Sequence, residues 1–203
     1  RRPGARGACG RLRGLRHEHQ GERQGQEGAR PRPQVLAKAR ERGAKIYCEI
    51  TGAGLGSSPT GPTAWPQDTE GIKRTVKRAL RNSGVKLTDV SAVMAAANGG
   101  RVLDQLETRA YQELFASCEH KPLVTSIKGA IGESFSGGGI RTCALALSVE
   151  KGWLPPTIGL SRPLVPMDFV MGKKKIMNGN HTVLAGISFG GTYAYLILSG
   201  WKC

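Results

Sequence analysis

Cysteine and histidine are the side chains best suited to nucleophilic or metal chemistry, and neither type is grouped for it in this sequence. The five cysteines are odd in number, widely scattered and without a Cys-x-x-Cys pair, which argues against a zinc knuckle and a disulfide framework. They are Cys9, Cys48, Cys118, Cys143 and Cys203. We expect packing or surface thiols in a reducing, cytoplasmic setting, with no metal and no cofactor.

The four histidines are equally dispersed, at His17, His19, His120 and His181. His120 and His181 precede predicted strands and have no motif around them, so we expect ordinary loop residues.

Positive charge is the second chemical feature, because 30 Lys and Arg oppose 15 Asp and Glu in 203 residues. Residues 1–33 hold nine Arg, no Lys, and no Val, Ile, Phe, Tyr, Trp or Met, so they cannot bury a core. We divide the chain into this Arg/Gly-rich basic segment and a folded domain over residues 34–203. The segment is disordered, or an out-of-frame translation of GC-rich DNA, or an RNA-binding arm, although it lacks the repeats or interleaved aromatics typical of such arms.

Apolar runs bear on a membrane location. No stretch of eighteen uncharged apolar residues occurs, and the N-terminus lacks the apolar core of a signal peptide. We therefore expect a soluble protein with no membrane partner.

Hydrophobic periodicity in residues 34–203 predicts helices that alternate with strands. The expected helices cover residues 35–42, 69–83, 103–114 and 134–150, and the expected strands 45–50, 90–96, 123–126, 182–189 and 192–199. Gly52 to Pro66, with its glycines and prolines, is expected to be a surface loop, and Gly190-Gly191 a hairpin turn. This pattern predicts a layered α/β domain.

Two helices carry finer expectations. In the helix over residues 134–150, Ile140, Cys143, Ala144 and Leu147 are spaced to face inward. The run Gly137-Gly138-Gly139 costs helix stability, which predicts a close backbone approach there. In the helix over residues 103–114, Asp104 and Glu107 are expected in the first turn, where the helix dipole favours acids.

Five ordered segments resemble the C-terminal half of β-ketoacyl-acyl-carrier-protein synthases. They are Ala39–Ile50, Glu107–Ala110, Thr125–Gly129, Leu154–Ile158 and Ser188–Gly191. The resemblance covers residues 34–203 and none of residues 1–33. It implies a thiolase-like layered fold, with a mixed five-stranded sheet and helices, preceded by a basic non-homologous segment. It also implies dimerisation and decarboxylative Claisen condensation of acyl thioesters.

The family's chemistry needs a cysteine from the first half, which this chain lacks, and two histidines from the second half. Where the family has His-Gly-Thr, this sequence reads Asn98-Gly99-Gly100. Five residues after the matching Lys128, where the family has its other histidine, stands Glu133. An amide can still donate to an oxyanion, but a carboxylate would oppose the developing negative charge.

Loss of both histidines resembles the chain-length-factor branch, whose non-catalytic subunits help to shape the acyl tunnel. This implies that Asn98, Lys128, Glu133 and Phe189 mark a degenerate site, with Phe189 as a tunnel wall or gate. A packed core phenylalanine and a buried ion-paired lysine are the simpler alternatives. A truncated active acyltransferase and a basic nucleic-acid-binding protein stay open as alternative functions.

Two basic groups suggest a docking surface. We expect a rim that attracts an acidic acyl carrier protein by long-range attraction. Its members are Arg74, Arg78, Arg81, Lys173, Lys174 and Lys175. The second expected partner is an active β-ketoacyl synthase or a first-half chain in a dimer, and we do not expect nucleic acid.

Overall fold

The structure is a computed structural model that describes residues 32–134 and 137–201. The chain divides into two units, residues 1–47 and residues 48–203, which are described separately. In the first unit, helix α2 spans Arg32–Glu41, and Gly43 follows it with a left-handed φ of 61°. This confirms the helix predicted near residues 35–42, while the predicted properties of residues 1–31 lie outside the described part.

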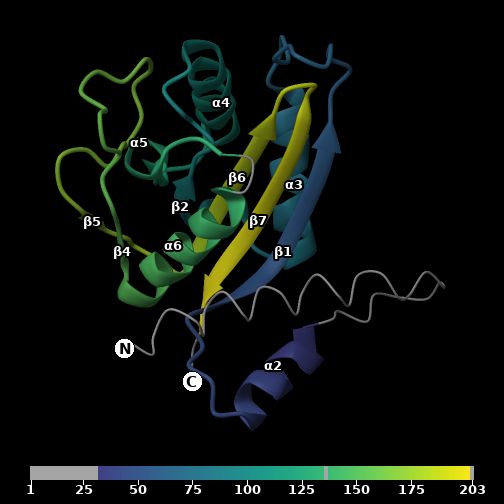
Figure 1. Ribbon diagram of the computed structural model, residues 1–203, viewed down its shortest axis with the longest axis vertical. Helices are drawn as coiled ribbons and strands as arrows, with labels where there is room; N and C mark the ends of the chain where they lie inside the picture. The colour runs from purple at the N-terminus through teal and green to yellow at the C-terminus, as the bar shows by residue number, and fades with distance from the viewer. Residues whose placement is uncertain (1–31, 135–136, 202–203) are drawn as a thin grey trace. The chain divides into compact units, whose positions relative to one another are not determined.

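The second unit is built on a mixed five-stranded sheet in the order β1-β7-β6-β2-β3 (Figure 1). The strands are β1 Cys48–Ser57, β2 Val90–Met94, β3 Leu123–Thr125, β6 His181–Ser188 and β7 Thr192–Gly200. Strand β2 runs parallel to β3 and β6, whereas β7 runs antiparallel to β6 and β1. The predicted fold class is therefore confirmed, and so is the hairpin at Gly190-Gly191, where φ is 75° and 69°. His181 opens β6 and is not a loop residue.

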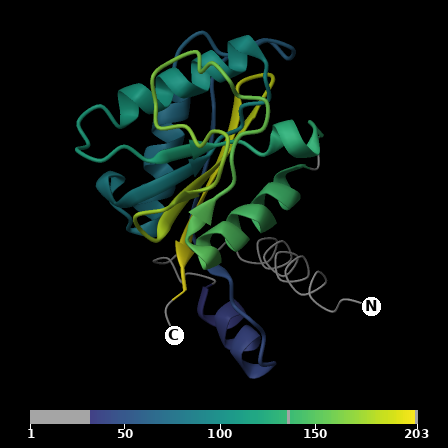
Figure 2. The ribbon, with the colours of Figure 1, turned by 90° about the vertical axis from the view of Figure 1, so that its left-hand side faces the viewer.

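Helices cover both faces of this sheet (Figure 2). Helices α3 (Glu70–Ser83) and α4 (Arg101–Leu114) pack on one face with Val93, Val183 and Ile197. Helix α6 (Gly137–Lys151) packs on the other face, where the alternate strand residues Leu184 and Leu198 meet Leu145. Short elements complete the unit. They are the 3-10 helix η2 (Leu87–Asp89), helix α5 (Lys128–Ile131), and strands β4 (Trp153–Leu154) and β5 (Lys175–Ile176).

Strand β1 corrects the predicted boundary between a strand and a loop. It starts at Cys48 and continues to Ser57 through the segment expected to be a loop. The reason is the close approach of α3: a Cβ on Gly52 would lie 2.6 Å from the Ala79 carbonyl oxygen, and one on Gly54 would lie 2.9 Å from the Ala79 nitrogen. These glycines serve helix packing rather than a turn.

Helix α6 buries a face that matches the predicted one only in part. Of the four residues expected to face inward, Cys143 and Ala144 are half-buried and Ala144 packs against the core. Ile140 and Leu147 are instead 57% and 40% exposed, while Arg141 and Leu145 are buried. Because apolar residues occur on two faces of this helix, periodicity alone could not select the inner one. The close approach expected at the glycine run is also wrong for Gly138 and Gly139, since no described atom other than chain neighbours and the helix's own backbone lies within 4 Å of an added Cβ.

The glycine contacts predict opposite effects of two alanine substitutions. Gly54→Ala should lower the free energy of unfolding by about 1–3 kcal/mol, because its Cβ must push α3 away from the sheet. Gly139→Ala should raise it by at most about 1 kcal/mol, because the helix gains an alanine without a clash. Urea unfolding of the three proteins measures both changes. Equal stability of the two variants would contradict this packing account.

Candidate functional site

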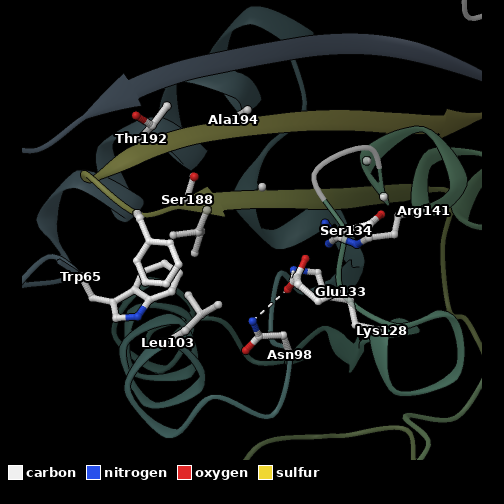
Figure 3. Close-up of a pocket in the computed structure, with 15 residues that line it drawn as sticks. Trp65, Asn98, Leu103, Lys128, Glu133, Ser134, Arg141, Ser188, Thr192 and Ala194 are labelled. Carbon is white, nitrogen blue, oxygen red and sulfur yellow. Dashed lines mark hydrogen bonds and ion pairs between the residues drawn. The ribbon is translucent and has the colours of Figure 1, made fainter. Parts of the chain in front are cut away.

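A pocket opens where the sheet's parallel strands end, and all four predicted site residues line it (Figure 3). Its lining residues are Trp65, Asn98, Leu103, Lys128, Glu133, Ser134, Gly137, Gly138, Arg141, Gly186, Ile187, Ser188, Phe189, Thr192 and Ala194. The structure thus brings Asn98, Lys128, Glu133 and Phe189 around one cavity. Their functional role stays a prediction.

Topology explains this convergence. Strands β3 and β6 flank β2 and run parallel to it, so the carboxyl ends of all three lie at one edge of the sheet. Asn98 follows β2, Lys128 opens the helix after β3, and Phe189 stands in the turn after β6. Residues far apart in sequence are therefore neighbours in space.

The polar side chains at one end of the pocket bind one another. Asn98 Nδ2 and Lys128 Nζ both donate to the same Glu133 oxygen, Oε2, each at 2.8 Å (Figure 3). Burial acts to raise the pKa of Glu133, but the hydrogen bonds from Lys128 and Asn98 outweigh it and hold that pKa below its usual range. The carboxylate is therefore ionised near neutral pH, and it engages a donor from each of two side chains that could otherwise face a substrate oxygen.

The backbone around Asn98 is fixed by Asp104 in the first turn of α4. Asp104 accepts from the backbone nitrogens of Asn98 at 3.0 Å and Gly99 at 3.1 Å, one on each carboxylate oxygen. Asn98 Oδ1 in turn accepts from Gly100 N at 2.9 Å. Burial raises the pKa of Asp104, although these backbone hydrogen bonds act in the opposite direction. The short loop is thus held rigidly with the Asn98 amide turned toward Glu133.

Arg141 is a pocket residue that the sequence analysis missed. Its side chain lies under the cavity, only 4% exposed, and Nη2 donates to the carbonyl oxygens of Ala95 at 2.6 Å and Ala185 at 2.7 Å. Burial lowers the pKa of this guanidinium. Arg141 therefore ties the end of β2 to the middle of β6 from α6. The sequence signal that could have identified Arg141 is a single arginine within the otherwise apolar pattern of this helix.

Glu107 also departs from its prediction. It is fully buried, and its Oε1 accepts from Ala96 N at 2.8 Å and from the Tyr111 hydroxyl at 2.6 Å. Its Oε2 has no hydrogen-bond partner among the described residues. Burial raises the pKa of Glu107, against the effect of these hydrogen bonds. Its position is thus set by the core behind the site and not by the helix dipole.

The apolar end of the pocket is built around an aromatic pair. The rings of Trp65 and Phe189 have centroids 4.3 Å apart and are tilted by 36°. Phe189 is 54% exposed, so it is not a packed core residue. Leu103 and Ile187 line the wall beside the pair. The cavity therefore has one charged end and one end suited to aliphatic groups.

The two predicted basic groups do not form one rim. Arg74, Arg78 and Arg81 lie on α3, whereas the lysine triplet lies at β5, on the other side of the unit (Figure 1). Some of these cations are already engaged. Arg78 donates to the Leu55 carbonyl at 2.9 Å, Lys175 pairs with Asp168, and Lys174 lies 4.9 Å from the centre of the Trp153 ring.

Comparison with known proteins places this geometry in a family. The family described as beta-ketoacyl synthase, C-terminal domain, matches residues 47–161. The chain belongs to the β-ketoacyl synthase family. It is 32% identical over 166 residues to 3-oxoacyl-[acyl-carrier-protein] synthase 2 of Rhizobium meliloti (strain 1021), covering 80% of this chain and 39% of that protein.

A further curated relative and a solved structure show similarity to the same family. The chain is 29% identical over 160 residues to the actinorhodin polyketide putative beta-ketoacyl synthase 1 of Streptomyces coelicolor, covering 77% of this chain and 34% of that protein. It also superposes on the ishigamide ketosynthase/chain length factor with a TM-score of 0.76 and 28% identity, over 82% of this chain and 41% of that one. The chain therefore spans about two fifths of the length of the first two curated relatives it matches.

Within residues 32–134 and 137–201, no helix is long and apolar enough to cross a bilayer. In the same part of the chain, no cluster of three or more His, Cys, Asp or Glu side chains could hold a metal ion.

Glu107 predicts a distinctive pH dependence of stability. A carboxyl whose folded-state pKa exceeds its unfolded value of about 4.3 binds protons more tightly when folded. Stability from this group is therefore lost as pH rises from about 4.3 through the raised pKa. The unfolding free energy of the wild type, relative to Glu107→Gln, should fall over this pH range in urea titrations.

Glu113→Gln is the matched control. The hydrogen bond from Lys73 lowers the pKa of Glu113, so stability from Glu113 is present above about pH 4.3 and lost as pH falls. The difference between wild type and Glu113→Gln should therefore rise with pH. Slopes of the same sign for both variants would contradict the assignment.

Proposed function

We propose that this chain is a non-catalytic, chain-length-factor-like half of a β-ketoacyl synthase assembly that shapes an acyl tunnel in fatty acid or polyketide biosynthesis. The observation that carries the proposal is the shared Glu133 oxygen, which engages Asn98 and Lys128 at 2.8 Å each. Decarboxylation builds negative charge on a thioester oxygen, and an ionised carboxylate beside it raises the barrier. The named ketosynthase/chain length factor neighbour, at 28% identity, supports this reading.

The apolar end of the pocket supports a tunnel role. Trp65, Leu103, Ile187 and Phe189 offer an aliphatic-compatible wall that does not require the polar end to react. Under this proposal the aromatic pair limits how far an acyl chain extends. Lys128 and Glu133 then serve to stabilise the emptied site as an internal ion pair.

The exposed face of α6 supports the presence of a partner half. Ile140 and Leu147 stand two turns apart on this helix and are 57% and 40% exposed, which is unusual for a helix covering a sheet. The relatives are about two and a half times as long as their matched part, which leaves room for such a partner. We propose that a first half, in this or another chain, covers this stripe in a dimeric assembly. The scattered cysteines favour a cytoplasmic assembly.

Decarboxylation of malonyl carrier protein tests the loss of catalysis. The chain is mixed with a cysteine-bearing first half of a related synthase, and release of carbon dioxide is measured. The wild-type chain should release it no faster than the first half alone. Asn98→His with Glu133→His should raise the rate about 100-fold, because two imidazoles restore donors to the thioester oxygen.

The control for charge alone is Asn98→His with Glu133→Gln, which removes the carboxylate but restores only one ring. Its rate should lie well below that of the double histidine variant. Turnover by the wild type equal to that of the double histidine variant would overturn the proposal. It would also favour the second candidate, an active acyltransferase, which the names of the 3-oxoacyl-[acyl-carrier-protein] synthase relatives support.

Carrier-protein docking gives a second test. We propose that an acidic acyl carrier protein approaches along the lysine triplet at β5 or the arginines of α3. Neutralising Lys173, Lys174 and Lys175 with glutamine should lower the association rate several-fold at low salt, and less at high salt. The matched comparison neutralises Arg74, Arg78 and Arg81. A salt-dependent rate unchanged by both triple variants, measured by stopped flow, would remove the docking proposal.

A further inference from the structure

A second pocket lies on the outer side of the Asn98 loop and shares no lining residue with the first. It is bounded by the ends of β2 and β3, the start of α4 and the segment between β4 and β5. Its lining residues are Ala95, Ala97, Gly99, Arg101, Asp104, Thr108, Val124, Thr125, Ser126, Thr157, Leu160, Arg162, Pro163, Leu164 and Phe169. None of these residues lines the first pocket, although Asp104 holds the backbone of the Asn98 loop that separates the two cavities.

The outer wall of this second pocket is fastened to the rest of the unit. Val124 and the segment after β4 exchange backbone hydrogen bonds, from Val124 N to Asp168 O and from Val170 N to Val124 O, both at 2.9 Å. Gln112 of α4 donates to the Pro166 carbonyl at 3.1 Å. The cavity is therefore formed by a held segment and does not depend on a ligand to order it.

The interior of the second pocket offers apolar surface, and its hydroxyl groups are already engaged. Val124 and Phe169 form buried wall, while Leu164 at the mouth is 52% exposed. Thr125 Oγ1 donates to the Pro155 carbonyl at 2.7 Å, and Thr157 Oγ1 accepts from Ser126 N at 3.0 Å. An aliphatic group entering here would displace water from carbon surface without breaking a polar contact.

Two arginine side chains at the second pocket are available to bind a ligand. The side chains of Arg101 and Arg162 are exposed, and neither has a hydrogen bond or ion pair with any residue in the described part of the chain. The one lining carboxylate, Asp104, is occupied by the backbone nitrogens of Asn98 and Gly99. A guanidinium presents a planar set of donors that matches a carboxylate in two parallel hydrogen bonds.

We propose that the second pocket binds a small amphiphile with an aliphatic body and a single carboxylate. The body lies against Val124, Leu164 and Phe169, and the carboxylate is held by Arg101 and Arg162. This site is independent of the tunnel proposed for the first pocket, because neither its residues nor its ligand contacts belong to that cavity.

The test uses the full chain and three probes of equal chain length: octanoate, octanol and octylammonium. Dissociation constants come from isothermal titration calorimetry. Octanoate should bind at least about tenfold more tightly than octanol, since charge-assisted hydrogen bonds add to the shared apolar contact. Octylammonium should bind more weakly than octanol. Equal binding of octanoate and octanol would overturn the proposal.

Variants locate the site of octanoate binding. Arg101→Gln with Arg162→Gln should weaken octanoate about tenfold and leave octanol unchanged. Leu164→Asp should weaken both probes, because it places a carboxylate at the apolar mouth. Arg81→Gln, which removes an exposed arginine of α3, is the control for net charge and should change neither by more than about twofold.

Two outcomes of the variant series count against the second pocket. An effect of the Arg101 and Arg162 variant no larger than that of Arg81→Gln would remove the carboxylate contact. Loss of octanoate binding in Trp65→Ala, with binding intact in Leu164→Asp, would place the ligand in the first pocket. Circular dichroism of each variant separates these results from misfolding, and the octanoate-to-octanol ratio in the wild type stands without any variant.

Discussion

The junction of strands β2 and β6 at their carboxyl ends is the constraint on which the rest of the site depends. Arg141 reaches from α6, on one face of the sheet, to the carbonyl oxygens of Ala95 and Ala185 just beyond β2 and within β6. On the other face, Glu107 of α4 accepts from the backbone of Ala96. The two buried side chains hold the same edge from opposite sides. The loops that carry Asn98 and Phe189 leave the sheet from this clamped edge.

A second set of contacts holds the polar end of the first pocket. Asn98 is fixed through its backbone by Asp104 and through its side chain by Glu133, while Lys128 closes the group from the start of α5. Asn98 Nδ2 and Lys128 Nζ thus share one acceptor, Glu133 Oε2. A substrate oxygen at this position would compete with Glu133 for the Asn98 and Lys128 donors.

The same loop separates two cavities with different chemistry. Asn98 faces a pocket in which cation and anion are paired, and Gly99 faces one with two arginines that have no partner in the described part of the chain. In both, aliphatic surface lies beside the charged groups. The two pockets differ in what their carboxylate binds. In the first pocket Glu133 pairs with the Lys128 ammonium group, whereas in the second pocket Asp104 accepts hydrogen bonds from backbone nitrogens and pairs with neither arginine. The two cavities therefore suit different ligands.

Local sequence determined the helices and strands for which hydrophobic periodicity and end signals point to the same element. The stripe of Ile72, Val76, Ala79 and Leu80 with Gly84 at its end defined α3, and the apolar run after Val90 defined β2, because one face or both must be buried. The resemblance to the family predicts that Asn98, Lys128, Glu133 and Phe189 lie around a common site.

Tertiary structure decided the rest. Alternating glycines in β1 have meaning only against α3, α6 could bury either of two apolar faces, and Arg141 gains its role from carbonyl oxygens about 45 residues away on both sides. Contacts between distant segments leave no period in the sequence, so only the packed sheet could reveal them.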